Sequence, residues 1–441
     1  MIKLFQNGHK YLGNKLTHLV LILLIIFFSA KNSRLAQCCD AEQYTWDAQN
    51  IFGVNEIHPW HNYGYGFFLH ILFSLGIKTR LAVAIVQSII LIISAFYFTK
   101  VYSKHFQINF KYLYTLVLLF CLPFSYGFSA FFLTEALVLP ALFILFSLSV
   151  GLFSSEVNKF KKDKYLIIIA VATFIWMIRP ALIWLPILFI ALLTIKYDAT
   201  NKLIRFIKGI LVLVLITLPQ YLLARNTIID FNKQPFADGV LHLNLAKVQS
   251  DWSLNYYRYA TNLSGCGDAR LNFSPVDITG EQATTYIGDY SFIQKLYTYL
   301  QHIVSGWDAL PGISYISNFS WFPWIFITLA SGFFICSPII LAYLLFSSKK
   351  FFVNVNKVPA YRLLVIFLAT QAVLVNTATE FRFNIMGWFI CGLIWIYLYK
   401  NFKSIIEIKY VAFLSTTITI LIVVLGQLAL NTSEIWKTCL K

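Results

Sequence analysis

Runs of apolar residues alternate with shorter polar stretches along the whole chain. The runs are about 15 to 25 residues long, which is the length that a helix needs to cross a hydrocarbon core roughly 30 Å thick. The apolar block at 66–76 is too short to cross, so it predicts a short interfacial or re-entrant helix. The pattern predicts an all-α polytopic membrane protein with about 11 transmembrane helices. The predicted spans are 16–30, 81–99, 112–128, 133–153, 165–178, 180–195, 206–224, 319–346, 363–377, 383–398 and 410–430.

The polar segments between the spans divide the chain into three parts. Residues 1–224 form an N-terminal transmembrane module, whose first outer loop, 31–80, carries candidate catalytic residues. Residues 225–318 follow as one long outer segment. A segment of this length is more than a connector, which predicts a small folded domain or a functional lid. Residues 319–441 form the C-terminal transmembrane helices.

The composition agrees with a membrane protein. Hydrophobic residues make up 59% of the chain and charged residues 12%, whereas a soluble domain is nearer half apolar and a quarter charged. The net charge of +16 would indicate a nucleic-acid partner in a soluble protein. Here 21 of the 35 Lys and Arg residues, but only four of the 19 acids, lie in segments on the side of the N-terminus. This positive-inside bias predicts a cytoplasmic N-terminus and no nucleic-acid partner.

The first outer loop holds the most informative polar residues. Helical spacing relates Asp40, Tyr44, Asp47 or Ala48, and Ile51, which predicts one polar face on a short helix. A carboxylate held just above a membrane span can act as a general base or bind a cation. The alternative from spacing alone is a solvated loop with ordinary acids.

This loop resembles that of the GT-C glycosyltransferases, polytopic enzymes that use sugars linked to polyprenyl phosphate. The resemblance lies in an acidic residue soon after the first span, then a tyrosine, an alanine and a short apolar helix. It implies that Asp40 is the catalytic base and that Glu42 stands near the second acid of the family. The family includes protein O-mannosyltransferases and the aminoarabinose transferases of lipid A. Its adjacent acids and Pro-Pro pair are absent here, where the acids lie two apart and the chain reads Gly64-Tyr65-Gly66.

Further ionisable residues are predicted on the same outer face. Glu135 opens the fourth span, Arg179 precedes a proline in a tight turn, and Glu380 and Arg382 precede the tenth span. Ionisable groups at membrane level are costly and often functional. Arginine suits a donor phosphate because its planar fork donates two hydrogen bonds and stays charged. The alternative for Arg179 and Arg382 is that their side chains extend to the lipid headgroups.

A metal site is a weaker hypothesis. His58 and His61 are separated by two residues, with no third ligand nearby in sequence, so packing or hydrogen bonding explains them better. His61 and Tyr44 are counted as supporting residues, together with Glu135 and Glu380. A divalent cation remains open as a cofactor.

These observations and the resemblance together predict an inverting glycosyltransferase on the extracytoplasmic side of a membrane, by expectation the bacterial inner membrane. The donor would be a polyprenyl-phosphate sugar and the acceptor a surface glycan, a lipid or a protein. One rival is an O-antigen polymerase or ligase, which would use the long outer segment and arginines rather than Asp40. Another is a lipid or sugar transporter, which would need ionisable residues at mid-span, and the predicted spans are almost free of charge.

Overall fold

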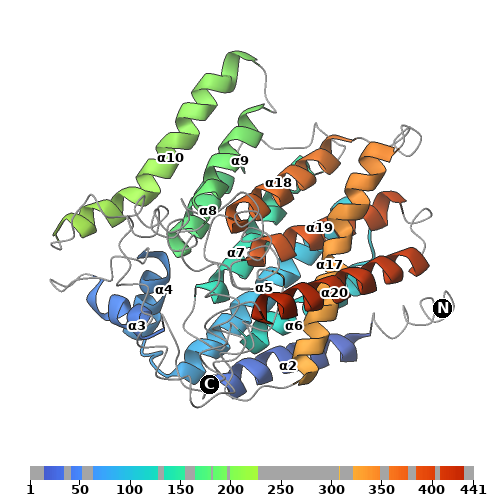
Figure 1. Ribbon diagram of the computed structural model, residues 1–441. Helices are drawn as coiled ribbons and strands as arrows, with labels where there is room; N and C mark the ends of the chain where they lie inside the picture. Colours follow the sequence, from blue (N-terminus) through green and yellow to red (C-terminus); the bar gives the residue numbers. More distant parts are fainter. Residues whose placement is uncertain are drawn as a thin grey trace. The chain divides into compact units, whose positions relative to one another are not determined.

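The structure is a computed structural model that describes residues 14–33, 41–51, 63–127, 134–153, 164–179, 182–195, 199–226, 307, 321–347, 357–375, 384–402 and 408–431. Within these ranges the chain is helical and contains no strand (Figure 1). The helices are α2 (Lys15–Asn32), α3 (Ala41–Asn50), α4 (Tyr63–Ser74), α5 (Arg80–Phe106), α6 (Phe110–Gly127), α7 (Glu135–Leu148), the 3-10 turn η1 (Val150–Leu152), α8 (Lys164–Ile178), α9 (Trp184–Ile195), α10 (Ala199–Asn226), α17 (Trp321–Ser347), α18 (Val358–Val375), α19 (Ile385–Phe402) and α20 (Ile408–Asn431).

A helix lies at each of the predicted spans, but their lengths differ. Three described segments are long and apolar enough to cross a membrane, namely Lys15–Asn32, Arg80–Phe106 and Thr328–Phe346. Others are apolar but shorter, and α9, with 12 residues, extends only about 18 Å at 1.5 Å per residue. Apolar runs in the sequence therefore located the helices, whereas the count of 11 spans is not established by helix length.

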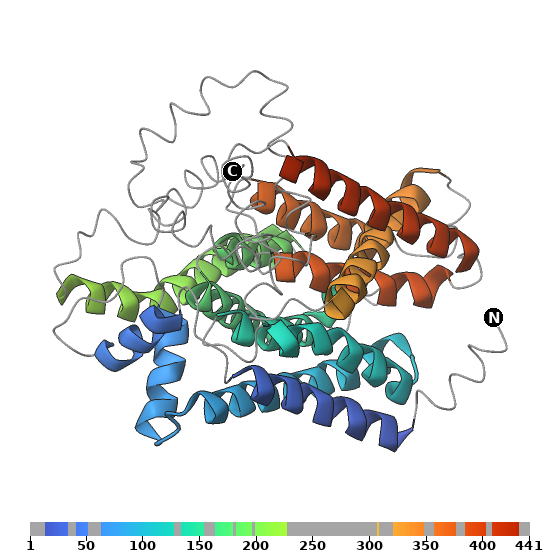
Figure 2. The same ribbon diagram turned by 60° about the horizontal axis from the view of Figure 1, so that its bottom comes forward.

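Two compact units divide the chain, one from Met1 to Asp238 and one from Gly239 to Lys441. In the first unit α5 packs against α2, α6 and α7, and α7 continues the bundle through α8. Helices α8, α9 and α10 contact one another, and the short helices α3 and α4 pack together beside α8 (Figure 2). In the second unit α17 packs against α18, α19 and α20.

Apolar side chains cover much of the outer surface of these helices. On α2, Leu16, Leu19, Leu23 and Phe27 are each more than half exposed, while Ile25 on the other face is fully buried. The exposed residues recur every three or four positions and form one stripe along the helix. A broad exposed apolar surface is typical of a lipid-facing or protein-facing helix rather than of a water-facing one.

Small residues let the helices of the second unit approach closely. A Cβ atom added at Gly332 of α17 would lie 2.7 Å from the carbonyl oxygen of Ser415 on α20. Such contact between backbones is characteristic of helix pairs in membranes, where small residues replace bulky side chains at the interface. Glycine is therefore needed at this crossing of α17 and α20.

Both short helices predicted in the first outer loop are present. Helix α3 covers 41–50, and the block predicted at 66–76 corresponds to α4, which begins three residues earlier. Tyr44, Asp47 and Ile51 are all less than 9% exposed, so the predicted face of α3 is buried in the protein. The alternative of a solvated loop is wrong for these three residues.

Candidate functional site

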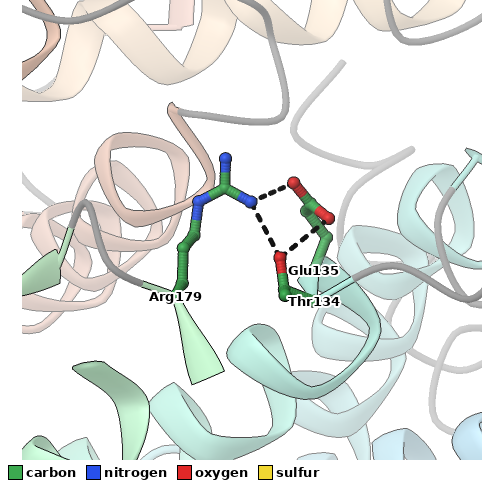
Figure 3. A network of polar contacts seen from close by, with 3 residues as sticks. All are labelled: Thr134, Glu135 and Arg179. Carbon is green, nitrogen blue, oxygen red and sulfur yellow. Dashed lines mark hydrogen bonds and ion pairs between the residues drawn. The ribbon is translucent and has the colours of Figure 1, made fainter. Parts of the chain in front are cut away.

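A buried ion pair joins α7 to the end of α8. Arg179 donates through Nη1 to the carboxylate of Glu135 and to Oγ1 of Thr134, the latter at 3.0 Å (Figure 3). The Thr134 hydroxyl in turn donates to Oε2 of Glu135 at 3.2 Å. All three residues are buried. Figure 3 shows the second terminal nitrogen of Arg179 directed away from Glu135.

The local sequence places both charges where the helix dipoles favour them. Glu135 is the first residue of α7, and a carboxylate is stabilised at a helix N-terminus. Arg179 directly follows α8, and its backbone N–H donates to the carbonyl of Ile175 at 2.9 Å, which continues the last turn. A cation is stabilised at a helix C-terminus, so the two helix ends and the two side chains have complementary charges.

Helix α4 packs directly on the backbone that leads to Arg179. A Cβ atom at Gly64 would lie 2.6 Å from the carbonyl carbon and oxygen of Met177 and 2.8 Å from the amide nitrogen of Ile178. Real Cβ atoms do not approach backbone so closely, so this contact requires glycine. The first turn of α4 is thereby held against the last turn of α8.

Tyr65 of α4 contacts both α3 and α5. Its hydroxyl donates to Oε1 of Gln87 on α5 at 2.8 Å, and its ring meets the ring of Tyr44 on α3 edge-on, with centroids 5.1 Å apart. Burial, and then the neighbouring Tyr44 and the negative charge of Glu135, raise the pKa of Tyr65. Tyr65 therefore stays protonated and keeps its donor role across neutral pH.

Asp47, on α3, is a second buried carboxylate in the first unit. It lies on the same face of α3 as Tyr44 and is 3% exposed. Burial, together with the charge of Asp47, raises the pKa of Tyr63 to about 12. Asp47 was predicted only as a member of the polar face, and its place one turn after Tyr44 was the signal for a role in the site.

The described residues bring some of the predicted site residues together. Glu135 and Arg179 form the ion pair, and Tyr44 contacts Tyr65, which itself was not among the predicted residues. Glu42 lies on α3, where only its backbone position is described. Asp40, His61, Glu380 and Arg382 lie outside the described residues.

A separate polar network in the second unit precedes α19. Asn384, buried and two residues after Arg382, accepts a hydrogen bond from Nε2 of Gln371 at 3.1 Å. Oε1 of Gln371 accepts another from the Trp307 indole at 2.9 Å, and Trp307 stacks on Trp388. This network holds the start of α19.

The described part of the chain contains no group of three or more His, Cys, Asp or Glu side chains placed to hold a metal ion. His58 and His61 fall outside that part.

The fold and the site define a helical protein with candidate membrane spans. A buried, charged polar centre lies beside two of its short helices. Comparison with protein-family models, with curated proteins and with solved structures finds no match to this chain.

Proposed function

We propose that this protein is an integral membrane glycosyltransferase of the GT-C type. It would move a sugar from a polyprenyl-phosphate donor to a glycan, lipid or protein acceptor. The observation that carries the proposal is the approach of the first outer loop to Arg179. Gly64, in the first turn of α4, packs on the backbone of Met177 and Ile178, which directly precede Arg179, and α3 packs on α4. This packing supports a site in which the loop that carries Asp40 and the arginine proposed to bind phosphate belong to neighbouring segments.

In the proposed reaction Asp40 takes the proton from the acceptor hydroxyl. The acceptor oxygen forms a bond to the anomeric carbon as the bond from that carbon to the phosphate oxygen breaks. The electron pair of the broken bond leaves with the lipid phosphate. One direct displacement inverts the anomeric carbon. Glu42 is the second acid of this loop and the alternative base.

Arg179 would stabilise the departing phosphate, whose negative charge grows in the transition state. The Glu135 carboxylate and the Thr134 hydroxyl hold one edge of its guanidinium in place. A preorganised cation spends no energy on reorientation when the charge develops. Arg382 is the second phosphate-binding candidate, and Glu380 and His61 are supporting residues.

The proposed topology has 11 spans, a cytoplasmic N-terminus and an active site on the extracytoplasmic face of a bacterial inner membrane. The distribution of Lys and Arg supports this orientation. The exposed apolar stripes of the helices support contact with lipid.

The proposal is tested by transfer from a polyprenyl-phosphate sugar to acceptor in reconstituted vesicles. Asp40→Asn keeps size and polarity but cannot take a proton at neutral pH. It should lower the rate by about 10²- to 10⁴-fold, which is the usual contribution of a general base. Glu42→Gln is the matched control in the same loop and should cost less.

The reverse order of losses would move the base to Glu42 and keep the rest of the proposal. Unchanged transfer in both variants would exclude the first loop as the active site. A polymerase or ligase centred on residues 225–318 would then explain the protein better.

A further inference from the structure

A cavity of about 530 Å³ opens beside α3 and α4, on residues that the proposed reaction does not use. It lies in the first unit, between the two short helices and the start of α5. Its size is within the usual range for a small-ligand site. Its lining residues are Thr45, Ala48, Gln49, His70, Phe73, Ser74, Lys78 and Arg80.

The charged lining of this cavity has one sign. Lys78 and Arg80 are exposed at its edge, and none of its lining residues is acidic. His70 is fixed by a hydrogen bond between its Nδ1 and the carbonyl of Ala48 at 2.8 Å. Thr45, Gln49 and Ser74 add neutral groups that can donate hydrogen bonds.

The N-terminal end of α5 also favours an anion in this cavity. Arg80 is the first residue of α5, where the backbone N–H groups already carry partial positive charge. Arginine and a helix N-terminus together are suited to phosphate.

The outer surface of α4 indicates where that anion comes from. Phe67 and Ile71 are both 43% exposed and Leu75, just past the helix, is 70% exposed. These three residues recur every four positions and form one apolar stripe. Two residues that line the cavity are the sequence neighbours of this stripe, because His70 precedes Ile71 and Ser74 precedes Leu75. An apolar stripe beside a basic cavity is the arrangement of a helix that lies in the headgroup layer of a bilayer.

We propose that this cavity binds the phosphate headgroup of an anionic membrane lipid, with Lys78 and Arg80 on the phosphate and the stripe of Phe67, Ile71 and Leu75 against the acyl chains. The site would hold α3 and α4 at the membrane surface. It does not depend on the proposed transferase activity, because none of its residues is assigned a part in that reaction.

The test uses the full-length protein in a neutral detergent, titrated with short-chain phosphatidylglycerol and followed by native mass spectrometry. Lys78→Gln/Arg80→Gln should weaken binding roughly 25-fold, since each basic residue contributes about fivefold near an anionic lipid. Ser74→Phe removes no charge but fills the cavity, and should weaken the same binding. Short-chain phosphatidylcholine, which is zwitterionic, should bind weakly to every variant.

Lys100→Gln/Lys104→Gln is the matched control. Both lysines are exposed near the other end of α5, and 24 residues of helix place Lys104 about 36 Å from Arg80. This control should bind phosphatidylglycerol as the wild type does. Equal binding by the Lys78/Arg80 variant would overturn the proposal. Displacement of the lipid by equimolar inorganic phosphate would also overturn it, because the cavity would then be a site for a free anion.

Discussion

At the scale of single residues, the decisive feature is a charge pair taken out of water. Removing two ions from water costs several kcal/mol each, and only close contact with good hydrogen bonds offsets that cost. Arg179 and Glu135 meet this condition through each other, through Thr134 and through the dipoles of two helices. Such a pair adds little to net stability, but removing only one of its two charges is costly.

Arg179→Ala should destabilise the protein by about 3–5 kcal/mol, because it leaves the Glu135 carboxylate buried without its cation. The melting temperature in detergent measures this. The double variant Arg179→Met/Glu135→Leu should recover most of the loss, since apolar groups of similar volume replace both charges. A single variant that melts like the wild type would contradict the description of this pair as desolvated.

A conservative change at Arg179 tests phosphate binding separately from folding. Arg179→Lys keeps the positive charge beside Glu135 but cannot present two parallel N–H groups to a phosphate. The variant should stay folded and lose transfer activity. If Arg179→Lys transfers sugar at the wild-type rate, the phosphate role falls to Arg382.

At the scale of elements, the position of α4 depends on two glycines that differ in surroundings. Gly64 faces the backbone of α8, with no room for a methyl group, whereas a Cβ atom at Gly66 would meet Asp47 Cβ at 3.4 Å, an ordinary contact. The sequence Tyr63-Gly64-Tyr65-Gly66 therefore contains one glycine required by packing and one that is not.

Gly64→Ala should separate α4 from α8 and destabilise the protein by about 1–3 kcal/mol, the usual cost of overpacking. Gly66→Ala is the control in the same helix turn and should be tolerated. Thermal unfolding compares the two variants, and the labelling rate of a cysteine introduced at Tyr63 reports whether the contact opens. Equal melting temperatures of the two variants would show that the backbone of α8 at Met177 can shift to make room for the added methyl group.

At the scale of the whole molecule, the distribution of charge leads to one testable orientation. The segments assigned to the cytoplasm hold most of the Lys and Arg residues, and most of the acids lie on the other side. Lys and Arg resist translocation across the membrane, so this asymmetry predicts which loops face outward.

A cysteine introduced at Asn262, in a background without native cysteines, should react with a membrane-impermeant maleimide in intact cells of an outer-membrane-permeable strain. A cysteine at Ser155, predicted to be cytoplasmic, is the control and should react only after the inner membrane is disrupted. The opposite pattern would invert the topology and place Asp40 in the cytoplasm, where the proposed donor is not presented.

The sequence alone determined the positions of the helices and the polar face of α3. Both follow from local rules, since apolar run length and spacing of three or four residues depend only on neighbouring residues. It also identified Glu135, Arg179 and Tyr44 as candidates, because charges and polar rings beside apolar spans stand out.

Only the tertiary structure decided which of those residues meet. Glu135 and Arg179 are 44 positions apart, and Tyr44 contacts Tyr65 across the packing of α3 on α4. Asp47 and the cavity at Lys78 and Arg80 likewise depend on how α3, α4 and α5 pack. Burial and contact between distant segments arise from packing of the whole unit, and no local pattern encodes them.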